Sequence, residues 1–278
     1  MKKIMIAAAV LAALTACNKT LIESPVADSE YGYINLGITA DTEMVLTKTM
    51  TEVSDPANYN IKIYDASSPT SYKYDGKYSG ISTTGVSVVR GTSYVVEAEN
   101  ITSTEAETGY GQLRVLGKTT GVVVEAGKTS SVSVECSPVN TQVTVAFEES
   151  FKNLFTSYSA KVTNDSNNAA TIANNARTLD MYVEGTAKNA YYNVDDSGSV
   201  TLKWVLTATN KDGVTKTYYK TFTSPKATKT TLSFAGNGAN GSIKVTIKAE
   251  NSMTSQKTMT FTIDPITDAI TESNNQNS

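Results

Sequence analysis

Apolar and polar side chains alternate along most of the chain after residue 30, which is the period-two pattern of a half-buried β-strand. The alternating positions are rich in Val, Ile, Thr and Tyr, residues that suit a pleated surface. Segments of this kind lie at residues 34–38, 59–63, 86–88, 94–98, 122–124, 132–136, 143–147, 200–208, 243–249 and 259–263. The pattern therefore predicts many short strands.

Helical patterning is scarce by comparison. The one candidate is Glu149–Tyr158, where Phe151, Leu154 and Phe155 share a face at helical spacing. Turn signals such as Asp75-Gly76 separate the strand segments. Many short strands with frequent turns and little helix predict an all-β fold, made of two tandem antiparallel β-sandwich domains.

The boundary between the two domains is expected at Pro138 to Asn140. Proline has no N–H to donate to a sheet, so Pro138 interrupts the strand before it, and the next strand begins almost at once. We assign residues 31–139 to an N-terminal sandwich and 140–264 to a C-terminal one. Residues 164–175, rich in Asn and Ala, are expected to form a loop, and residues 265–278 a flexible tail.

The first sixteen residues have the features of a bacterial export signal. Lys2 and Lys3 precede an apolar run that is too short to span a bilayer permanently. The run ends in Leu14-Thr15-Ala16-Cys17, which resembles the lipobox of bacterial lipoproteins. That resemblance implies cleavage before Cys17, acylation of Cys17 and a stable membrane anchor, because several acyl chains insert together. Residues 17–30 then form a polar tether.

Composition excludes several classes of chemistry. The chain has no histidine, which removes Ser-His-Asp and Cys-His nucleophilic sites and nearly all zinc enzyme sites. Its second cysteine, Cys136, is in phase with Val132 and Val134 and is interpreted as a buried apolar residue. The net charge of −3 becomes more negative when Lys2 and Lys3 leave with the signal, which argues against a nucleic-acid partner.

Acidic residues offer no convincing site. The segment Asp195–Ser199 lacks the spacing of a calcium-binding loop and is better explained as a hairpin turn. The pairs Asp41 with Glu43 and Glu105 with Glu107 are spaced as on one solvated face of a strand. We therefore expect no catalytic residue, no metal and no cofactor.

Tyrosine is the most frequent aromatic residue, with 15 of them in the sequence. Tyr72, Tyr74 and Tyr78 share a face if their strand is unbroken, so they are weak candidates for a ligand-binding patch that stacks on sugar rings. Packing at the half-buried edge of a sheet is the alternative. Trp204 lies on the apolar face of its own strand and is expected in the core.

Several segments resemble those of uncharacterised two-domain lipoproteins of Bacteroidales. The densest match is Val132–Tyr158, with a strand, a Cys-x-x-x-Asn junction and a short Phe-rich segment. Further matches, in the expected order, are Asp55–Asp65, Arg90–Ala98, Ala190–Tyr192 and the strand around Trp204. These lipoproteins are similar in architecture to fimbrillin-like proteins, whose transthyretin-like β-sandwiches build or anchor surface pili.

The resemblance implies an outer-membrane lipoprotein, exposed at the cell surface, with an adhesive or pilus-associated role. Polymerising members are cleaved after an arginine near the first strand, which opens a groove for a donor strand. This sequence has no arginine before Arg90. The departure favours a non-polymerising anchor, tip or accessory protein over a shaft subunit.

Three functions follow, in descending order of support. The first is a non-catalytic adhesive or fimbria-associated lipoprotein whose partners are the membrane, through Cys17, and pilus subunits, a host protein or a glycan. The second is a glycan-binding surface lipoprotein that uses exposed tyrosines. The third is an enzyme, for which the sequence offers no motif.

Overall fold

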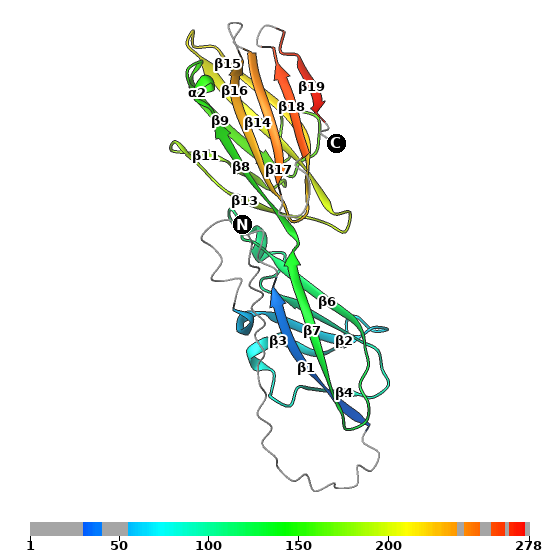
Figure 1. The fold of residues 1–278 in the computed structure, drawn as a ribbon. Coiled ribbons are helices and arrows are strands. Elements are labelled where there is room, and N and C mark those ends of the chain that lie inside the picture. The colour runs from blue at the N-terminus through cyan, green and yellow to red at the C-terminus, as the bar shows by residue number, and fades with distance from the viewer. Residues whose placement is uncertain (1–29, 41–54, 238–241, 251–256, 265–266, 276–278) are drawn as a thin grey trace, which may run out of the picture.

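The computed structural model describes residues 30–40, 55–237, 242–250, 257–264 and 267–275 as two β-rich domains placed end to end (Figure 1). Strands make up most of these residues, which confirms the predicted all-β fold class. The elements of the N-terminal domain are β1 (Tyr31–Ala40), η1 (Pro56–Asn58), β2 (Asn60–Asp65), β3 (Tyr72–Lys77), η2 (Tyr78–Gly80), β4 (Val86–Val89), β5 (Tyr94–Glu99), η3 (Glu105–Glu107), β6 (Val115–Val122) and β7 (Thr129–Pro138).

The N-terminal domain is a sandwich of two layers joined along one side. Its strands follow the order β3-β2-β5-β6-β7-β1-β4, and β6 meets β7 only where Val115 pairs with Pro138 and Leu116 with Ser137. The alternating apolar residues of both layers point into one core, which includes Ile34 and Val134 from one layer and Ile61 and Val96 from the other. The period-two pattern of the sequence thus buries one face of each layer.

The C-terminal domain repeats this arrangement with two separate main sheets. One sheet has the order β10-β9-β14-β15 and the other β13-β8-β16-β17-β18-β19. The elements are β8 (Asn140–Phe147), α2 (Glu149–Lys152), β9 (Phe155–Thr163), β10 (Thr178–Asp180), β11 (Tyr182–Val183), β12 (Thr186–Ala187), β13 (Ala190–Asn193), β14 (Ser199–Asn210), β15 (Thr215–Pro225), β16 (Lys229–Asn237), β17 (Ser242–Glu250), β18 (Lys257–Ile263) and β19 (Ile270–Asn275).

Most strand pairs are antiparallel, as expected, but each domain also contains one parallel pair. β1 runs parallel to β7, with Tyr33 opposite Thr129 and Ala40 opposite Cys136. β8 runs parallel to β16 in the second domain. Alternation alone cannot distinguish the two kinds of pairing, because both have a side-chain period of two.

The predicted helix over Glu149–Tyr158 is wrong in its second half. α2 ends at Lys152, and Phe155 already begins β9. Phe151 is fully buried, and its ring stacks on Phe155 with 4.6 Å between centroids. The apolar residues that share a helical face in the sequence meet instead across a turn between a short helix and a strand.

The flexible tail expected from residue 265 is also wrong in part. Residues Ile270–Asn275 form β19, which pairs antiparallel with β18 at the edge of the six-stranded sheet. β19 has few apolar residues, so its sequence shows little alternation. Its backbone hydrogen bonds to β18 hold it at the sheet edge.

Other expectations are confirmed by the described residues. Trp204 and Cys136 are buried, with 0% and 1% of their surfaces exposed. The segment from residue 164 to 175 contains no helix or strand. Asp195 accepts a hydrogen bond from the Ser197 backbone N–H at 2.8 Å, which makes that segment a turn, but the predicted hairpin is wrong because β13 and β14 on either side belong to different sheets. Within the described ranges, no helix combines the length and the apolar character needed to cross a bilayer.

Candidate functional site

The predicted lipidation site, Cys17, lies outside the described residues, so its acylation stays a prediction. The described chain begins at Glu30 and enters β1 at Tyr31. Tyr31 pairs with Val89 of β4, at the end of the N-terminal domain farthest from the C-terminal domain (Figure 1). The first described residues therefore lie at one extremity of the long axis of the molecule.

The three candidate tyrosines do not form a single patch. Tyr74 and Tyr78 pack against the core of the N-terminal domain. The hydroxyl of Tyr74 donates to the Lys77 carbonyl at 2.5 Å, and that of Tyr78 donates to the Leu36 carbonyl at 2.7 Å. Both rings therefore pack half-buried at the edge of the sheet, which is the alternative to a ligand-binding patch.

Tyr72 is separated from the other two by a β-bulge. The register between β2 and β3 shifts between Ile63 and Tyr64, so that Tyr74 lies opposite Ile63 but Tyr72 lies opposite Tyr64. Tyr72 contacts Tyr64 edge-to-face at 5.9 Å and is 44% exposed. A bulge changes which face a side chain takes, and the spacing of tyrosines along the sequence gives no sign of it.

Two exposed tyrosines were missed by sequence reasoning. Tyr31 and Tyr33 lie on the outward face of β1 and are 50% and 37% exposed. The signal that identifies them is their alternation with the buried Ile34 and Leu36 across the strand. They lie at the end of the N-terminal domain farthest from the C-terminal domain.

The contact between the two domains is built around Arg177, which precedes β10. Its guanidinium donates to three backbone carbonyls: Glu107 at 3.0 Å, Gly109 at 2.9 Å and Tyr191 at 2.8 Å. It also lies 4.6 Å from the ring centroid of Tyr192. A planar cation with several fixed donors suits such a set of acceptors. Arg177 thus fastens the segment after β5 to the C-terminal domain.

Further hydrogen bonds continue this contact. Glu107 accepts from the Asn193 backbone N–H at 2.8 Å, and the Asn193 amide donates to the Ser103 carbonyl at 2.8 Å. The hydroxyl of Tyr110 donates to the Asp180 carbonyl at 2.7 Å. The acidic pair Glu105 and Glu107, expected on a strand, therefore lies in η3, and Glu107 takes part in joining the domains.

The short connection between the domains is itself tied down. Asn140 is fully buried, and its side chain donates to the Gln112 carbonyl at 2.7 Å and accepts from the Arg114 N–H at 3.2 Å. Only Val139 lies between β7 and β8. Because these bonds and those of Arg177 lie on different elements, the two domains are held as one elongated body.

A cavity of about 320 Å³ opens at the far end of the C-terminal domain. Its volume is at the lower end of the range for small-molecule sites, roughly 300–1,000 Å³. β8 leads away from the domain junction and α2 follows it, so this end is opposite to Tyr31 (Figure 1). The lining residues are Asn153, Leu154, Phe155, Ala208, Asn210, Lys211, Asp212, Val214, Lys216 and Tyr218.

The cavity combines apolar and polar groups. Leu154, Phe155 and Ala208 supply apolar surface, and Phe155 is supported from below by the buried ring of Phe151. Tyr218 is 4% exposed, and burial raises the pKa of its hydroxyl, which stays protonated and able to donate. Val214 is 50% exposed at the β14–β15 connection.

A second hollow of about 330 Å³ shares Lys216 and Tyr218 with the first. Lys216 forms an ion pair with Asp268 at 2.7 Å. Apolar side chains with a few polar groups can hold a peptide or a sugar. The tip of the C-terminal domain is thus the candidate binding region.

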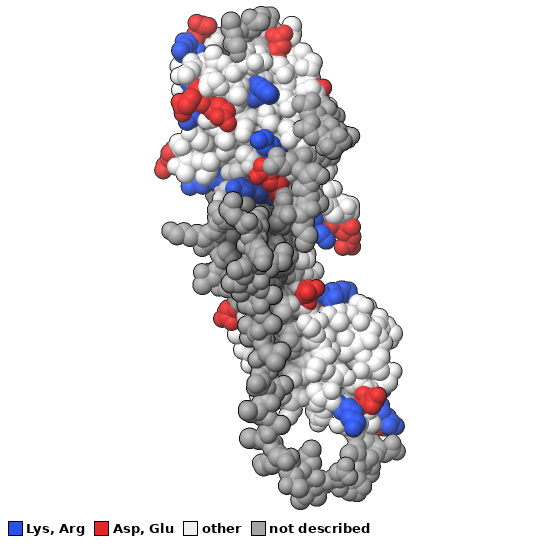
Figure 2. Space-filling model, viewed as in Figure 1, with Lys and Arg blue, Asp and Glu red and all other residues white. Residues whose placement is uncertain are grey.

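The remaining sequence candidates carry no visible chemistry. Burial raises the pKa of the Cys136 thiol to about 11, so the thiolate needed for nucleophilic attack is rare at neutral pH. In the part of the chain that the structure describes, no three His, Cys, Asp or Glu side chains gather to hold a metal ion. On the face shown in Figure 2, acidic and basic side chains lie near one another rather than in patches of one sign.

A family model for a domain of unknown function, DUF4493, matches residues 30–265. No curated protein matches the chain.

Solved structures also align with the chain. A fimbrial assembly protein from Parabacteroides distasonis aligns at 11% identity with a TM-score of 0.39, covering 85% of this chain and 97% of that one. The fimbrial anchor protein Mfa2 from Porphyromonas gingivalis aligns at 13% identity with a TM-score of 0.39, covering 80% and 98%.

Proposed function

We propose a non-catalytic, adhesive or fimbria-associated role at the cell envelope for this chain, which belongs to the DUF4493 family. In this proposal Cys17 carries lipid in the outer membrane, residues 17–30 form the tether, and the two domains extend from it. The far end of the C-terminal domain then meets a pilus subunit, a host protein or a glycan.

One observation carries the proposal: the cavity and Tyr31, at the start of β1, lie at opposite ends of the molecule. Tyr31 begins β1 at the base, and the cavity between the start of β9 and the β14–β15 connection is at the tip. The bonds of Arg177 and Asn140 support a stiff link between these ends. A stiff stem with a binding tip suits a protein that makes contacts away from a membrane.

Glycan binding is the second candidate, and the mixed lining of the cavity favours it. Apolar Phe155 lies beside the amide-bearing Asn153 and Asn210, a combination that can stack on a sugar ring and bond its hydroxyls. Tyr72 stays available as the exposed member of the tyrosine group. Binding of an oligosaccharide array by the purified chain, and its loss in Phe155→Ser, would favour this candidate.

Anchoring is tested by changing Cys17 to alanine. We expect loss of palmitate labelling and release of the protein from the membrane fraction. Cys136→Ala is the matched control, since Cys136 is the second of the two cysteines and is buried in the N-terminal domain. Continued labelling of the Cys17 variant would contradict the lipobox interpretation.

Adhesion through the tip is tested with a pair of exposed valines. Val214 at the cavity and Val123 in the N-terminal domain are 50% and 52% exposed. We expect Val214→Glu to reduce attachment of cells to their substratum or pili, and Val123→Glu to leave it unchanged. Protease accessibility on intact cells must show both variants at the surface. Equal attachment by the two variants would contradict the role of the tip of the C-terminal domain in adhesion.

A further inference from the structure

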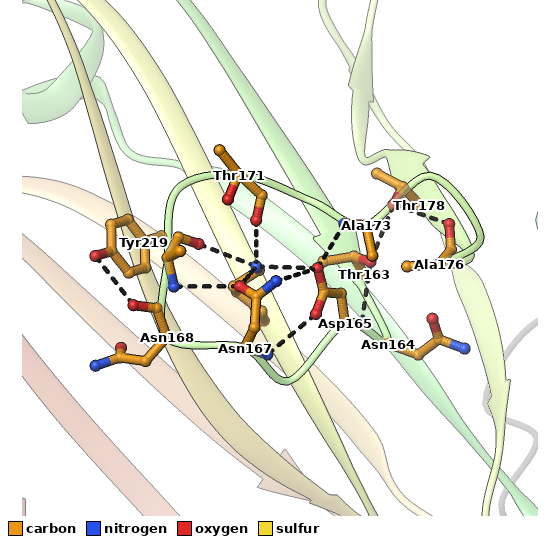
Figure 3. A network of polar contacts seen from close by, with 12 residues as sticks. Thr163, Asn164, Asp165, Asn167, Asn168, Thr171, Ala173, Ala176, Thr178 and Tyr219 are labelled. Atoms are coloured by element: carbon orange, nitrogen blue, oxygen red, sulfur yellow. Dashed lines mark hydrogen bonds and ion pairs between the residues drawn. The ribbon is translucent and has the colours of Figure 1, made fainter.

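A lysine is buried on the outer face of the four-stranded sheet, where a strand normally meets solvent. β14 turns Leu202, Trp204 and Leu206 into the core, so Lys203 faces the other way. Its side chain is nevertheless 0% exposed, because the loop between β9 and β10 lies over it. Figure 3 shows Asp165, Asn167 and Thr171 of this loop turned toward a common centre.

The ammonium nitrogen of Lys203 lies among oxygens of that loop. Nζ donates to Asn167 Oδ1 at 2.8 Å and to the carbonyls of Ala169 at 3.0 Å and Thr171 at 2.9 Å. The carboxylate oxygen Oδ2 of Asp165 is 3.5 Å away. Because Oδ1 of Asn167 is bonded directly to Cγ, the amine lies beside an amide carbon.

Asp165 touches both nitrogens of this group. The same oxygen, Oδ2, that faces Lys203 accepts from Nδ2 of Asn167 at 2.8 Å. It also accepts from the Ala173 backbone N–H at 2.7 Å, which fixes its position. An amine, an amide carbon and a carboxylate that contacts both the amine and the amide nitrogen are the parts of an acyl-transfer reaction.

We propose that Lys203 and Asn167 react with each other to form an amide cross-link between their side chains, with Asp165 as the proton carrier. The Nζ–Cγ bond forms and the Cγ–Nδ2 bond breaks. Nζ starts as an ammonium and loses two protons, which Oδ2 of Asp165 relays in turn to Nδ2, so that Nδ2 leaves as an ammonium ion. A primary amide and an ammonium group become a secondary amide and an ammonium ion, so no oxidant, reductant or cofactor takes part.

The surroundings favour this exchange over reaction with water. The fold holds both reactants in contact, which removes most of the entropic barrier to a bimolecular step. The side chains of Lys203 and Asp165 are 0% and 9% exposed, so the amine and the proton carrier are shielded from water, although Asn167 itself is exposed. Backbone N–H groups of Ala173 and Asn167 keep the pKa of Asp165 below its ordinary value, so the group is ionised at neutral pH, and its contacts with both nitrogens place it to relay protons between them.

The cross-link would close the chain covalently between the β9–β10 loop and β14. Like a disulfide, it would keep the β9–β10 loop attached to β14 when the chain is pulled. The inference is independent of the proposed function, since it concerns a reaction within the chain rather than what the chain binds.

Peptide mapping of the full chain, purified in its folded state, tests the proposal. Trypsin cuts after Lys161, Arg177, Lys188 and Lys211 but not after a lysine whose amine is acylated. We expect residues 162–177 joined to residues 189–211 in one branched peptide, uncut at Lys203. Its mass should be lower than the sum of its parts by one ammonia, about 17 Da. Free peptides 162–177 and 189–203 from folded protein would overturn the proposal.

Variants separate the roles of the three residues. Asn167→Ala should give only unlinked peptides, and Asp165→Asn should do so while the circular dichroism of the fold is kept. Asn168→Ala is the matched control, because the contact given for Asn168 is made by its backbone carbonyl, and it should keep the branched peptide. A link that persists in Asp165→Asn overturns the role of Asp165, and a link from Lys203 to another residue overturns that of Asn167.

Discussion

The two domains share an architecture but fill their cores with different side chains. All six phenylalanines and the single tryptophan of the sequence lie between Phe147 and Phe261, in the C-terminal domain. The core of the N-terminal domain consists mainly of Val and Ile, with Tyr59 and Tyr94 as its largest buried side chains. The same fold class is therefore reached by two different ways of filling space.

The difference shows where the molecule concentrates its packing. Around Phe147, the rings of Phe151, Tyr158, Tyr182 and Phe234 lie with centroids 4.5–5.1 Å away. Aromatic pairs at such separations add to the free energy of burial. This cluster lies beneath the cavity at the tip, because Phe151 stacks on Phe155. The C-terminal domain thus supplies a firm platform, and the N-terminal domain serves as the stem.

The largest expected effect comes from removing a ring from that cluster. Phe151→Ala should lower the free energy of unfolding of the C-terminal domain by about 3–5 kcal/mol, through lost burial and the cavity left behind. Trp204 is the only tryptophan in the sequence, so its fluorescence during denaturation follows this domain. Phe151→Leu should cost much less because it keeps most of the volume. A loss below about 1 kcal/mol for the alanine variant would contradict a packed platform.

The next effect concerns the coupling of the two domains. Arg177→Ala removes three charge-assisted hydrogen bonds and should cost about 1.5–3 kcal/mol. It should also separate the Trp204 fluorescence transition from the circular dichroism transition of the whole chain. Lys161→Ala is the control, since its pair with Asp180, at 3.6 Å, is exposed and should contribute at most about 1 kcal/mol. Transitions that stay coincident would show that Arg177 does not hold the domains together.

Two glycines sharpen the same comparison at smaller scale. Gly109 and Gly111 both have positive φ, +59° and +80°, in the segment that meets the C-terminal domain. An alanine Cβ at Gly111 would lie 2.3 Å from the Ala106 carbonyl oxygen and 3.2 Å from Tyr191, whereas at Gly109 it meets nothing within 4 Å.

Gly109→Ala should therefore cost about 1–2 kcal/mol, from the backbone conformation alone. Gly111→Ala should cost more and loosen the domain contact, which limited proteolysis of the segment 100–113 would reveal. Equal effects of the two substitutions on stability and proteolysis would contradict the close approach of Gly111 to Tyr191.

The sequence predicts the strands well and the contacts between distant segments poorly. Alternation depends only on local spacing, and it correctly predicts the buried faces of Ile61 and Ile63 and of Leu202 and Trp204. The register shift at Tyr64 and the meeting of Arg177 with Glu107 depend on how separate strands align. Alternation carries no information about either feature, so it predicts neither the separation of Tyr72 from Tyr74 and Tyr78 nor the contact between the domains at Arg177.

The predictions of a helix over Glu149–Tyr158 and of a flexible tail from residue 265 are wrong in part for related reasons. Phe151 and Phe155 fit a helical face as well as they fit a turn into a strand, and only the pairing of β9 with β14 decides between them. β19 has too few apolar residues for alternation to predict a strand there. The network around Lys203 was hidden in the same way, because Asn167 and Lys203 lie 36 positions apart.

The smallest effect is expected on the outer face of the stem, where ions are paired near solvent. Burial raises the pKa of Glu97, but hydrogen bonds from Lys118 at 2.8 Å and Tyr64 at 2.6 Å outweigh it, and the pKa lies below its ordinary value. A depressed carboxyl pKa stabilises the folded state above the unfolded pKa of about 4.3, and this stability is lost as the pH falls through the folded pKa.

Glu97→Gln should flatten that loss between about pH 5 and 3. Because Lys118 is half exposed, the change should be small and should shrink further in salt. An unchanged acid limb in circular dichroism would place the acid sensitivity elsewhere. Because Arg177 and Asn140 couple the two domains, the acid limb of Trp204 fluorescence should flatten as well, and a change confined to circular dichroism would show that the domains unfold separately at low pH.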